Sequence, residues 1–291
     1  MEWDSLAQMA SEATQQGISL GRLMYQAEAE DNEGDLTSTY ERMSRNWQVM
    51  KAAVSEAVNY PLPSRSGMIG GDGKRLLDYV EQGPTLSGHV LGAVGRALSV
   101  AELNAAMGLI VAAPTAGSAG ILPGVLTMLA EEADRSEEEI VLSLFCAAAV
   151  GIVIAQKASL SGAEGGCQAE CGSAAAMAAA AAVELAGGTP AQVLEAVAIS
   201  LKNNLGLVCD PVAGLVEVPC AKRNALGAAN ALVAADLALA GIKSVIPADE
   251  VIEAMGEIGR AMPVSLRETS QGGLAQTPTG RELAAKILNS L

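Results

Sequence analysis

The stretch SLSGAEGGCQAECGSAAAMAAAAAVELAGG, residues 159–188, sets two cysteines at the start of a long run of alanine. Alanine is the best helix former, and its small side chain lets neighbouring helices approach closely. The run after Gly172 therefore predicts a helix that packs tightly against others. Small residues beside thiols also leave room for a cofactor seated against the chain.

Helical spacing of apolar residues continues along most of the chain. Half of the 291 residues are hydrophobic, but only 2% are aromatic, and β-branched alternating runs are scarce. Together with the run after Gly172, helical patterns cover 5–30, 36–58, 89–113, a segment ending near 133, 137–156, 189–206, 221–241 and 246–262. Ser136 followed by three glutamates, and Pro247 with Asp249, are typical helix starts. We predict an all-α fold whose function lies in its loops.

The chain divides into an arm and a core. Residues 1–60 read as an amphipathic helical arm, interrupted at 31–35. Residues 59–84 are rich in proline and glycine, which predicts a loop and the boundary of the arm. Residues 61–291 form the helical domain with the functional loops, and the two parts are expected to make one continuous domain.

Charge and hydropathy exclude several functions. With 18 basic and 33 acidic side chains, the net charge of −15 argues against a nucleic-acid partner and fits an acidic soluble cytoplasmic protein. The apolar segment Ile140–Ala155 is shorter than the about 20 residues that span a membrane, so we expect a buried helix and no membrane partner. The acidic N-terminus is not a secretory signal. Five cysteines in a reducing compartment favour metal or redox chemistry.

Three cysteines lie at breaks between helices, each marked by glycine or proline: Cys167, Cys209 and Cys220. Loops can bend around a cluster, so this triad suits iron–sulfur ligation. Cys146 lies inside an apolar helix and reads as a core thiol. Cys171 shares a face with Cys167 if that segment is helical, so by spacing alone these two could also be a ligand pair. Zinc is disfavoured because Cys-x-x-Cys pairs are absent, and inert thiols stay an alternative.

Four motifs, in order, resemble the iron–sulfur-dependent L-serine dehydratases, and more narrowly the alpha subunit of their two-subunit form. They are APTAGSAGILPG (113–124), SLSGAEGGCQAECG (159–172), NNLGLVCDPVAGLVEVPCAKRNA (203–225) and RETSQGGLA (267–275). The resemblance implies a [4Fe–4S] cluster on Cys167, Cys209 and Cys220, with one iron free for substrate, while Cys146 and Cys171 stay structural. It also implies deamination of L-serine to pyruvate and ammonia without pyridoxal phosphate, together with a beta subunit. Homodimerisation is a further expected mode of assembly.

L-Serine as substrate requires groups that bind a carboxylate and an ammonium. Arg223 and Arg267 are the expected carboxylate ligands, with Glu217 and Glu268 as their alternative ion-pair partners. The other candidates are short polar residues within or near the motifs, each equally suited to a capping role: Asn104, Thr115, Ser118, Ser161, Asn204 and Ser270.

The single histidine, His89, is a weak candidate for the general base. The resemblance implies that an active-site histidine comes from the beta portion, so the base in this chain is unassigned. Two other function classes stay open. One is a helical protein that binds or senses an iron–sulfur cluster without turning over serine, and the other is a structural protein with inert thiols.

Overall fold

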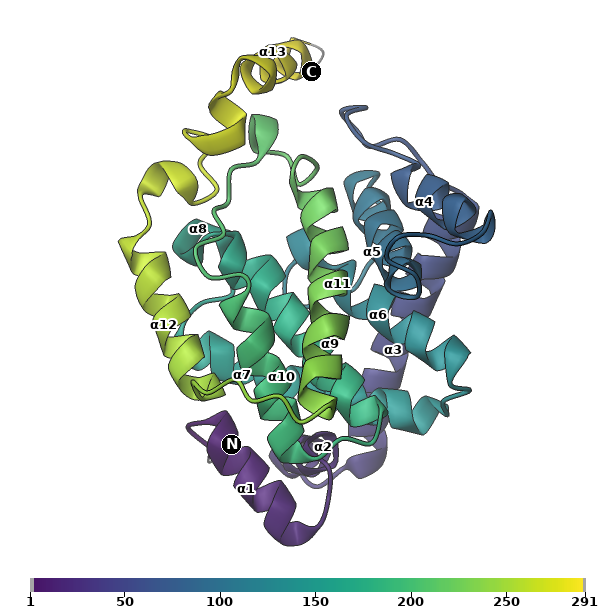
Figure 1. The fold of residues 1–291 in the computed structure, drawn as a ribbon, viewed down its shortest axis with the longest axis vertical. Helices are drawn as coiled ribbons and strands as arrows, with labels where there is room; N and C mark the ends of the chain where they lie inside the picture. Colours follow the sequence, from purple (N-terminus) through teal and green to yellow (C-terminus); the bar gives the residue numbers. More distant parts are fainter. Residues whose placement is uncertain (1–2, 290–291) are drawn as a thin grey trace.

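In the computed structural model, which describes residues 3–289, the alanine-rich run forms the central helix α9 (Ser173–Leu185) (Figure 1). Of its 13 residues all but Glu184 are buried. Three long helices pack directly against it: α7 (Glu137–Lys157), α10 (Pro190–Lys202) and α11 (Cys220–Leu239). Because alanine ends at Cβ, these helices approach the axis of α9 closely, as its sequence predicts.

The other α-helices surround this centre. They are α1 (Leu6–Gln16), α2 (Leu20–Asp31), α3 (Leu36–Asn59), α4 (Asp72–Glu81), α5 (Val90–Ala105), α6 (Ile121–Glu132), α8 (Gly162–Gly165), α12 (Ala248–Ala261) and α13 (Pro278–Leu288). Residues 3–289 contain no strand, and their one β-bridge joins Cys209 to Arg267. The all-α prediction is confirmed.

The apolar helix α7 is a core helix. It starts as predicted at Ser136, which forms a capping box with Glu139. Within the part of the chain that the structure describes, it alone is long and apolar enough to cross a membrane by length and composition, but 67% of its most apolar window is buried inside the protein. That burial fits a helix packed between α9 and the N-terminal helices.

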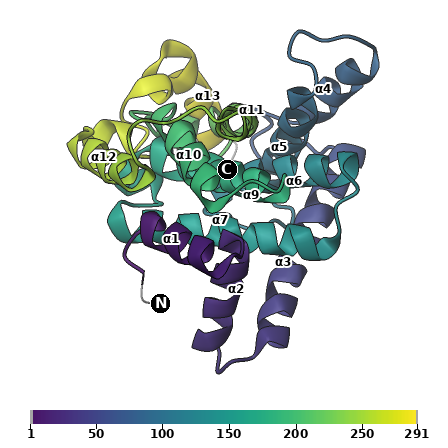
Figure 2. The same cartoon turned by 60° about the horizontal axis from the view of Figure 1, so that its bottom comes forward.

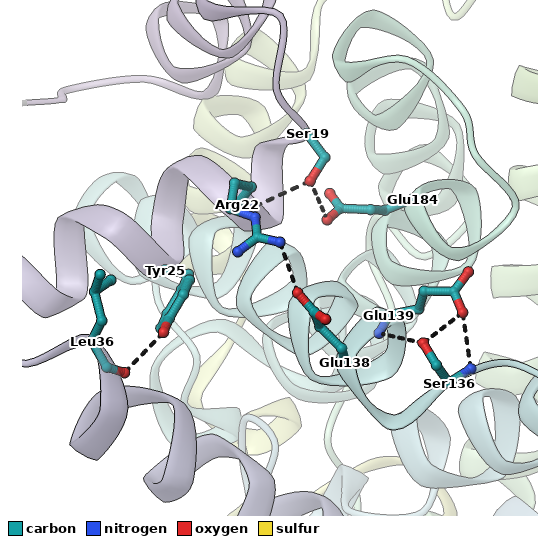
Figure 3. Close-up of polar contacts among 8 residues, drawn as sticks. All are labelled: Ser19, Arg22, Tyr25, Leu36, Ser136, Glu138, Glu139 and Glu184. Carbon is teal, nitrogen blue, oxygen red and sulfur yellow. Dashed lines mark hydrogen bonds and ion pairs between the residues drawn. The ribbon is translucent and has the colours of Figure 1, made fainter.

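The N-terminal segment is three helices packed on the core, and Figure 2 shows the ends of α2 and α3 projecting together from the body. The contact with the core centres on Glu184, which accepts a hydrogen bond from Ser19 Oγ at 2.8 Å (Figure 3). Glu184 Oε2 also accepts from the Gly21 N–H at 2.8 Å. Beside it Arg22 Nη2 bonds Glu138 Oε1 at 2.9 Å. The arm therefore shares one hydrophobic core with the rest of the chain.

The predicted loop over 59–84 is wrong for its second half. Residues Asp72–Glu81 form α4, which packs on α5. The glycines that suggested a loop lie at its start, where Gly71 adopts a left-handed backbone (φ 77°) and precedes the acidic first turn at Asp72. The leucines Leu76 and Leu77 then supply the apolar face that the proline-rich composition concealed.

A substitution at Gly21 tests the close contact of α2 with α7 and α9. A Cβ at this position would overlap the Leu142 carbonyl oxygen and Glu184 Oε1. We expect Gly21→Ala to lower the free energy of unfolding by about 1–3 kcal/mol, measured by chemical denaturation. The control is Gly92→Ala, where the added methyl meets only flexible side-chain ends and alanine favours the helix. Equal stability of the two variants would contradict the close packing.

Candidate metal centre

Four cysteines gather where α9 begins: Cys167, Cys171, Cys209 and Cys220. Each is at most 8% exposed, and their thiols are close enough to shift one another's pKa. They come from separate segments, namely the wide turn η2 (Gln168–Gly172) with the residue before it, the irregular segment 203–219, and the first residue of α11. The predicted triad therefore converges, and Cys171 joins it.

Cys167 and Cys171 form a hydrogen-bonded pair. The bond from Cys171 stabilises the thiolate of Cys167 and lowers its pKa, with help from the Arg223 guanidinium. The same bond and burial raise the pKa of Cys171. Cys167 is thus the thiol of this pair that ionises first.

Burial dominates at the other two thiols. It raises the pKa of Cys209, and repulsion from Cys167 and Glu170 adds to the effect. Burial also raises the pKa of Cys220 to about 12, although Cys220 opens α11 and helix starts favour anions. Without a bound cation these two side chains are neutral thiols at pH 7.

Two carboxylates stand beside the thiols. Carboxylate oxygens of Glu170 and Glu268 and the sulfur of Cys209 lie within 4.8 Å of one another. Thr115 Oγ1 donates to Glu170 Oε1 at 2.9 Å, and burial raises the pKa of Glu170. A Cβ on Gly162 would come within 2.6 Å of Glu170 Oε2 and 3.1 Å of Cys209 Sγ, so a larger residue there would displace the Glu170 carboxylate.

Arg223 connects the loops of the centre. Its Nη1 donates to the Val208 carbonyl and its Nη2 to Asp210 Oδ1, both at 2.8 Å, and the Arg223 and Asp210 side chains are 13% and 4% exposed. Asp210 Oδ2 in turn accepts from the Leu274 N–H at 2.7 Å. The predicted partner Glu217 instead accepts from the hydroxyls of Ser64 and Ser66.

The short polar candidates lie around the centre, and most of them form hydrogen bonds to backbone carbonyl groups there. Asn104 donates to the Ala116 carbonyl, Ser118 contacts Thr115, Asn204 donates to the Ser200 carbonyl, Ser270 donates to the Pro211 carbonyl, and Ser161 precedes α8. These bonds shape η1 (Ala116–Ser118) and the segments facing it. Their contact with substrate stays a prediction.

Two candidates, Arg267 and His89, and the predicted core thiol Cys146 have side chains that lie apart from the four gathered thiols. Arg267 points into a neighbouring cavity lined by none of the four cysteines. His89 pairs with Glu132 at the far end of α5 from Asn104, on the order of 20 Å along the helix axis. Cys146 is fully buried beside Glu184, towards the other end of α9.

The centre fits a sulfur-bound metal group. It holds four buried thiols, the ligand type preferred by iron–sulfur clusters, and two carboxylates lie beside one of them, Cys209. Gly162 lets α8 pass close to Cys209 and Glu170, and Ser173 Oγ, next to η2, is buried with no hydrogen-bond partner among residues 3–289. An excess of acidic groups around one arginine also favours a bound cation.

Sequence reasoning missed Glu170, Asp210 and the position of Glu268 beside Cys209. Each is the neighbour in sequence of a residue that the sequence analysis names: Glu170 in CQAEC, Asp210 in CDP and Glu268 in RET. Their positions next to Cys171, Cys209 and Arg267 are the sequence feature from which they could have been predicted as site residues. Which of these side chains face the thiols depends on the turn at η2 and on the bridge of Cys209 with Arg267.

The fold and this centre define an all-helical protein with a buried cysteine site at the start of its central helix. The family described as "Serine dehydratase alpha chain" matches residues 15–275. The chain therefore belongs to the serine dehydratase alpha chain family, which confirms the resemblance seen in the four motifs.

Named relatives agree. The "Probable L-serine dehydratase, alpha chain" of Bacillus subtilis (strain 168) is 56% identical over 271 residues, 93% of this chain and 90% of that one. The "L-serine dehydratase, alpha chain" of Peptoniphilus asaccharolyticus is 44% identical over 275 residues, 94% of each. The "L-serine dehydratase 1" of Escherichia coli (strain K12) is 42% identical over 239 residues, which are 79% of this chain but 52% of that longer protein.

The Arg223–Asp210 pair should be a main support of the centre. Removing one partner of a buried pair leaves the other charge uncompensated, so we expect Arg223→Met to lower the free energy of unfolding by about 3–5 kcal/mol in chemical denaturation. In the control Lys286→Met, which removes an exposed pair with Glu282, the loss should stay below about 1 kcal/mol. Similar losses in both would refute a supporting role for the buried pair.

Proposed function

We propose that this chain is the alpha subunit of an L-serine dehydratase, which deaminates L-serine to pyruvate and ammonia. One observation carries the proposal: Cys167, Cys209 and Cys220, far apart in sequence, meet at one buried site in a family whose relatives are named L-serine dehydratases. The five free thiols also support a reducing, cytoplasmic location.

We propose that these three cysteines bind a [4Fe–4S] cluster with one iron left for substrate. When bound, the cluster supplies a Lewis acid for the departing hydroxyl group. The chain's own residues would shape the rest of the pocket. Gly162 lets α8 approach Cys209 closely, and Thr115 orients the Glu170 carboxylate, which with Glu268 suits the substrate ammonium.

We further propose a beta subunit that completes the site. The alpha-chain names of two relatives and the longer E. coli relative, of which this chain matches 52%, both support a second portion. Exposed apolar side chains near η1 offer a docking face: Met107 (70% exposed), Leu109 (71%) and Val216, which lies against Gly117. The general base would come from that subunit, since His89 is far from the thiols.

Ligand assignment is tested by single substitutions. We expect Cys167→Ser, Cys209→Ser and Cys220→Ser to lose most iron and sulfide after anaerobic reconstitution, because each removes a thiolate ligand. The matched controls Cys146→Ser and Cys171→Ser should retain both. Full iron content in any of the first three, or loss in Cys171→Ser with Cys167 intact, would overturn the assignment.

Catalysis is tested by a pyruvate assay on the iron-loaded chain. The chain alone should form pyruvate from L-serine negligibly, and addition of the beta subunit should restore turnover. His89→Ala should keep most of that activity, because its side chain is 60% exposed and remote from the thiols. An iron-loaded pair that makes no pyruvate would favour a binding or sensing role, and a folded but inactive His89→Ala pair would return the base to this chain.

A further inference from the structure

A cavity lies next to the thiol centre, and none of the four cysteines lines it. It has a volume of about 490 Å³ and opens between α8, α12 and η4 (Val264–Leu266). Its polar lining is Ser159, Glu164, Arg260, Arg267 and Thr269. Alanine, glycine, valine and methionine side chains make up the rest.

Arg267 is the unusual residue of this cavity. Its Nη1 donates to the Glu164 carbonyl at 3.3 Å, but its Nε is buried with no hydrogen-bond partner among residues 3–289. Because this Nε has almost no accessible surface, a ligand in the cavity would reach the guanidinium through its Nη atoms, and a carboxylate there would form charge-assisted hydrogen bonds with them. Arg260, an exposed residue of α12, adds a second guanidinium to the lining.

Two arginines outnumber the one acidic side chain of the lining, Glu164, whose carboxylate forms no ion pair with either of them. Glu164 uses its Oε2 to accept from Ser159 Oγ at 2.6 Å, and only its backbone carbonyl bonds Arg267. Positive charge over small apolar walls suits an anion with a short apolar body. A carboxylate matches a guanidinium in a two-pronged hydrogen bond.

We propose that this cavity binds a short-chain carboxylate through Arg267 and Arg260, with the ligand's carbon atoms against the alanines and Met255. The site is distinct from the thiol centre and does not rest on the proposed catalytic function. L-Serine and pyruvate, the substrate and product of that function, both carry the required carboxylate and are two sources of such a ligand.

The two sites share backbone. The Cys209 N–H donates to the Leu266 carbonyl (2.8 Å) and the Glu268 N–H to the Cys209 carbonyl (2.7 Å), so Glu268 faces Cys209 while Arg267 faces the cavity. On the other wall, α8 presents Gly162 to Cys209 and Glu164 to the cavity. A bound carboxylate would therefore hold two segments that also position Cys209.

Binding is measured by titration calorimetry on the full-length chain without iron, with sodium pyruvate and L-serine as separate probes and neutral lactamide as the ligand control. We expect binding of at least one carboxylate and none of lactamide. Binding of pyruvate alone identifies a keto-acid source, and binding of L-serine alone an amino-acid source. Either result supports the proposed site if the arginine variants described next lose this binding.

Arg267→Gln and Arg260→Gln should each weaken binding about tenfold or more, as expected for loss of a charge-assisted hydrogen bond. Arg45→Gln on α3 is the matched control, because Arg45 is 67% exposed and far along the chain from the cavity, and it should bind as the unchanged chain does. If Arg267→Gln does not fold, Val264→Trp keeps both arginines and blocks the cavity from its exposed rim.

No binding of either carboxylate to the folded chain would overturn the proposal, as would unchanged binding in Arg267→Gln or Val264→Trp. Because the titration needs neither iron nor the beta subunit, its failure is distinct from failure of the iron and pyruvate assays.

Discussion

The packing of three helices against an alanine helix is the constraint on which the structure depends. All but one residue of α9 are buried, and its side chains rarely extend beyond Cβ. α7, α10 and α11 can therefore lie close to one axis. The first residue of α11 is Cys220, and η2 with Cys171 leads directly into α9. The geometry that fills the core thus also brings thiols from distant segments together.

The thiol centre combines charges that would repel one another in isolation. Glu170, Glu268 and the ionisable thiols face a single nearby guanidinium, that of Arg223, which is already committed to Asp210. Burial then keeps Cys209 and Cys220 protonated. The side chains of such a site do not attract one another, so the surrounding chain must hold them in place. The ion pair of Arg223 and the close approach at Gly162 are the contacts that do so.

Much of the fold could be predicted from the sequence because helix signals are local. The capping residue Ser136 and the alanine run mark their helices directly. The helix α4 was missed because the glycines and prolines before it dominate the composition of its segment. The convergence of Cys167, Cys209 and Cys220 was predicted from loop placement and family motifs, but the proximity of Cys171 depends on the wide turn at η2.

The position of Arg267 shows what a motif leaves undetermined. In RET, Arg267 and Glu268 are neighbours, and carboxylate recognition favours the arginine as the residue nearest the substrate. Glu268 adopts a left-handed backbone (φ 63°), however, so the chain turns there, and the bridge to Cys209 decides which of the two side chains faces the thiols. Glu268 takes the thiol side, so Arg267 is left to a cavity of its own. The backbone bridge between Cys209 and Arg267 thus places Glu268 at the thiols and Arg267 in the cavity at the same time.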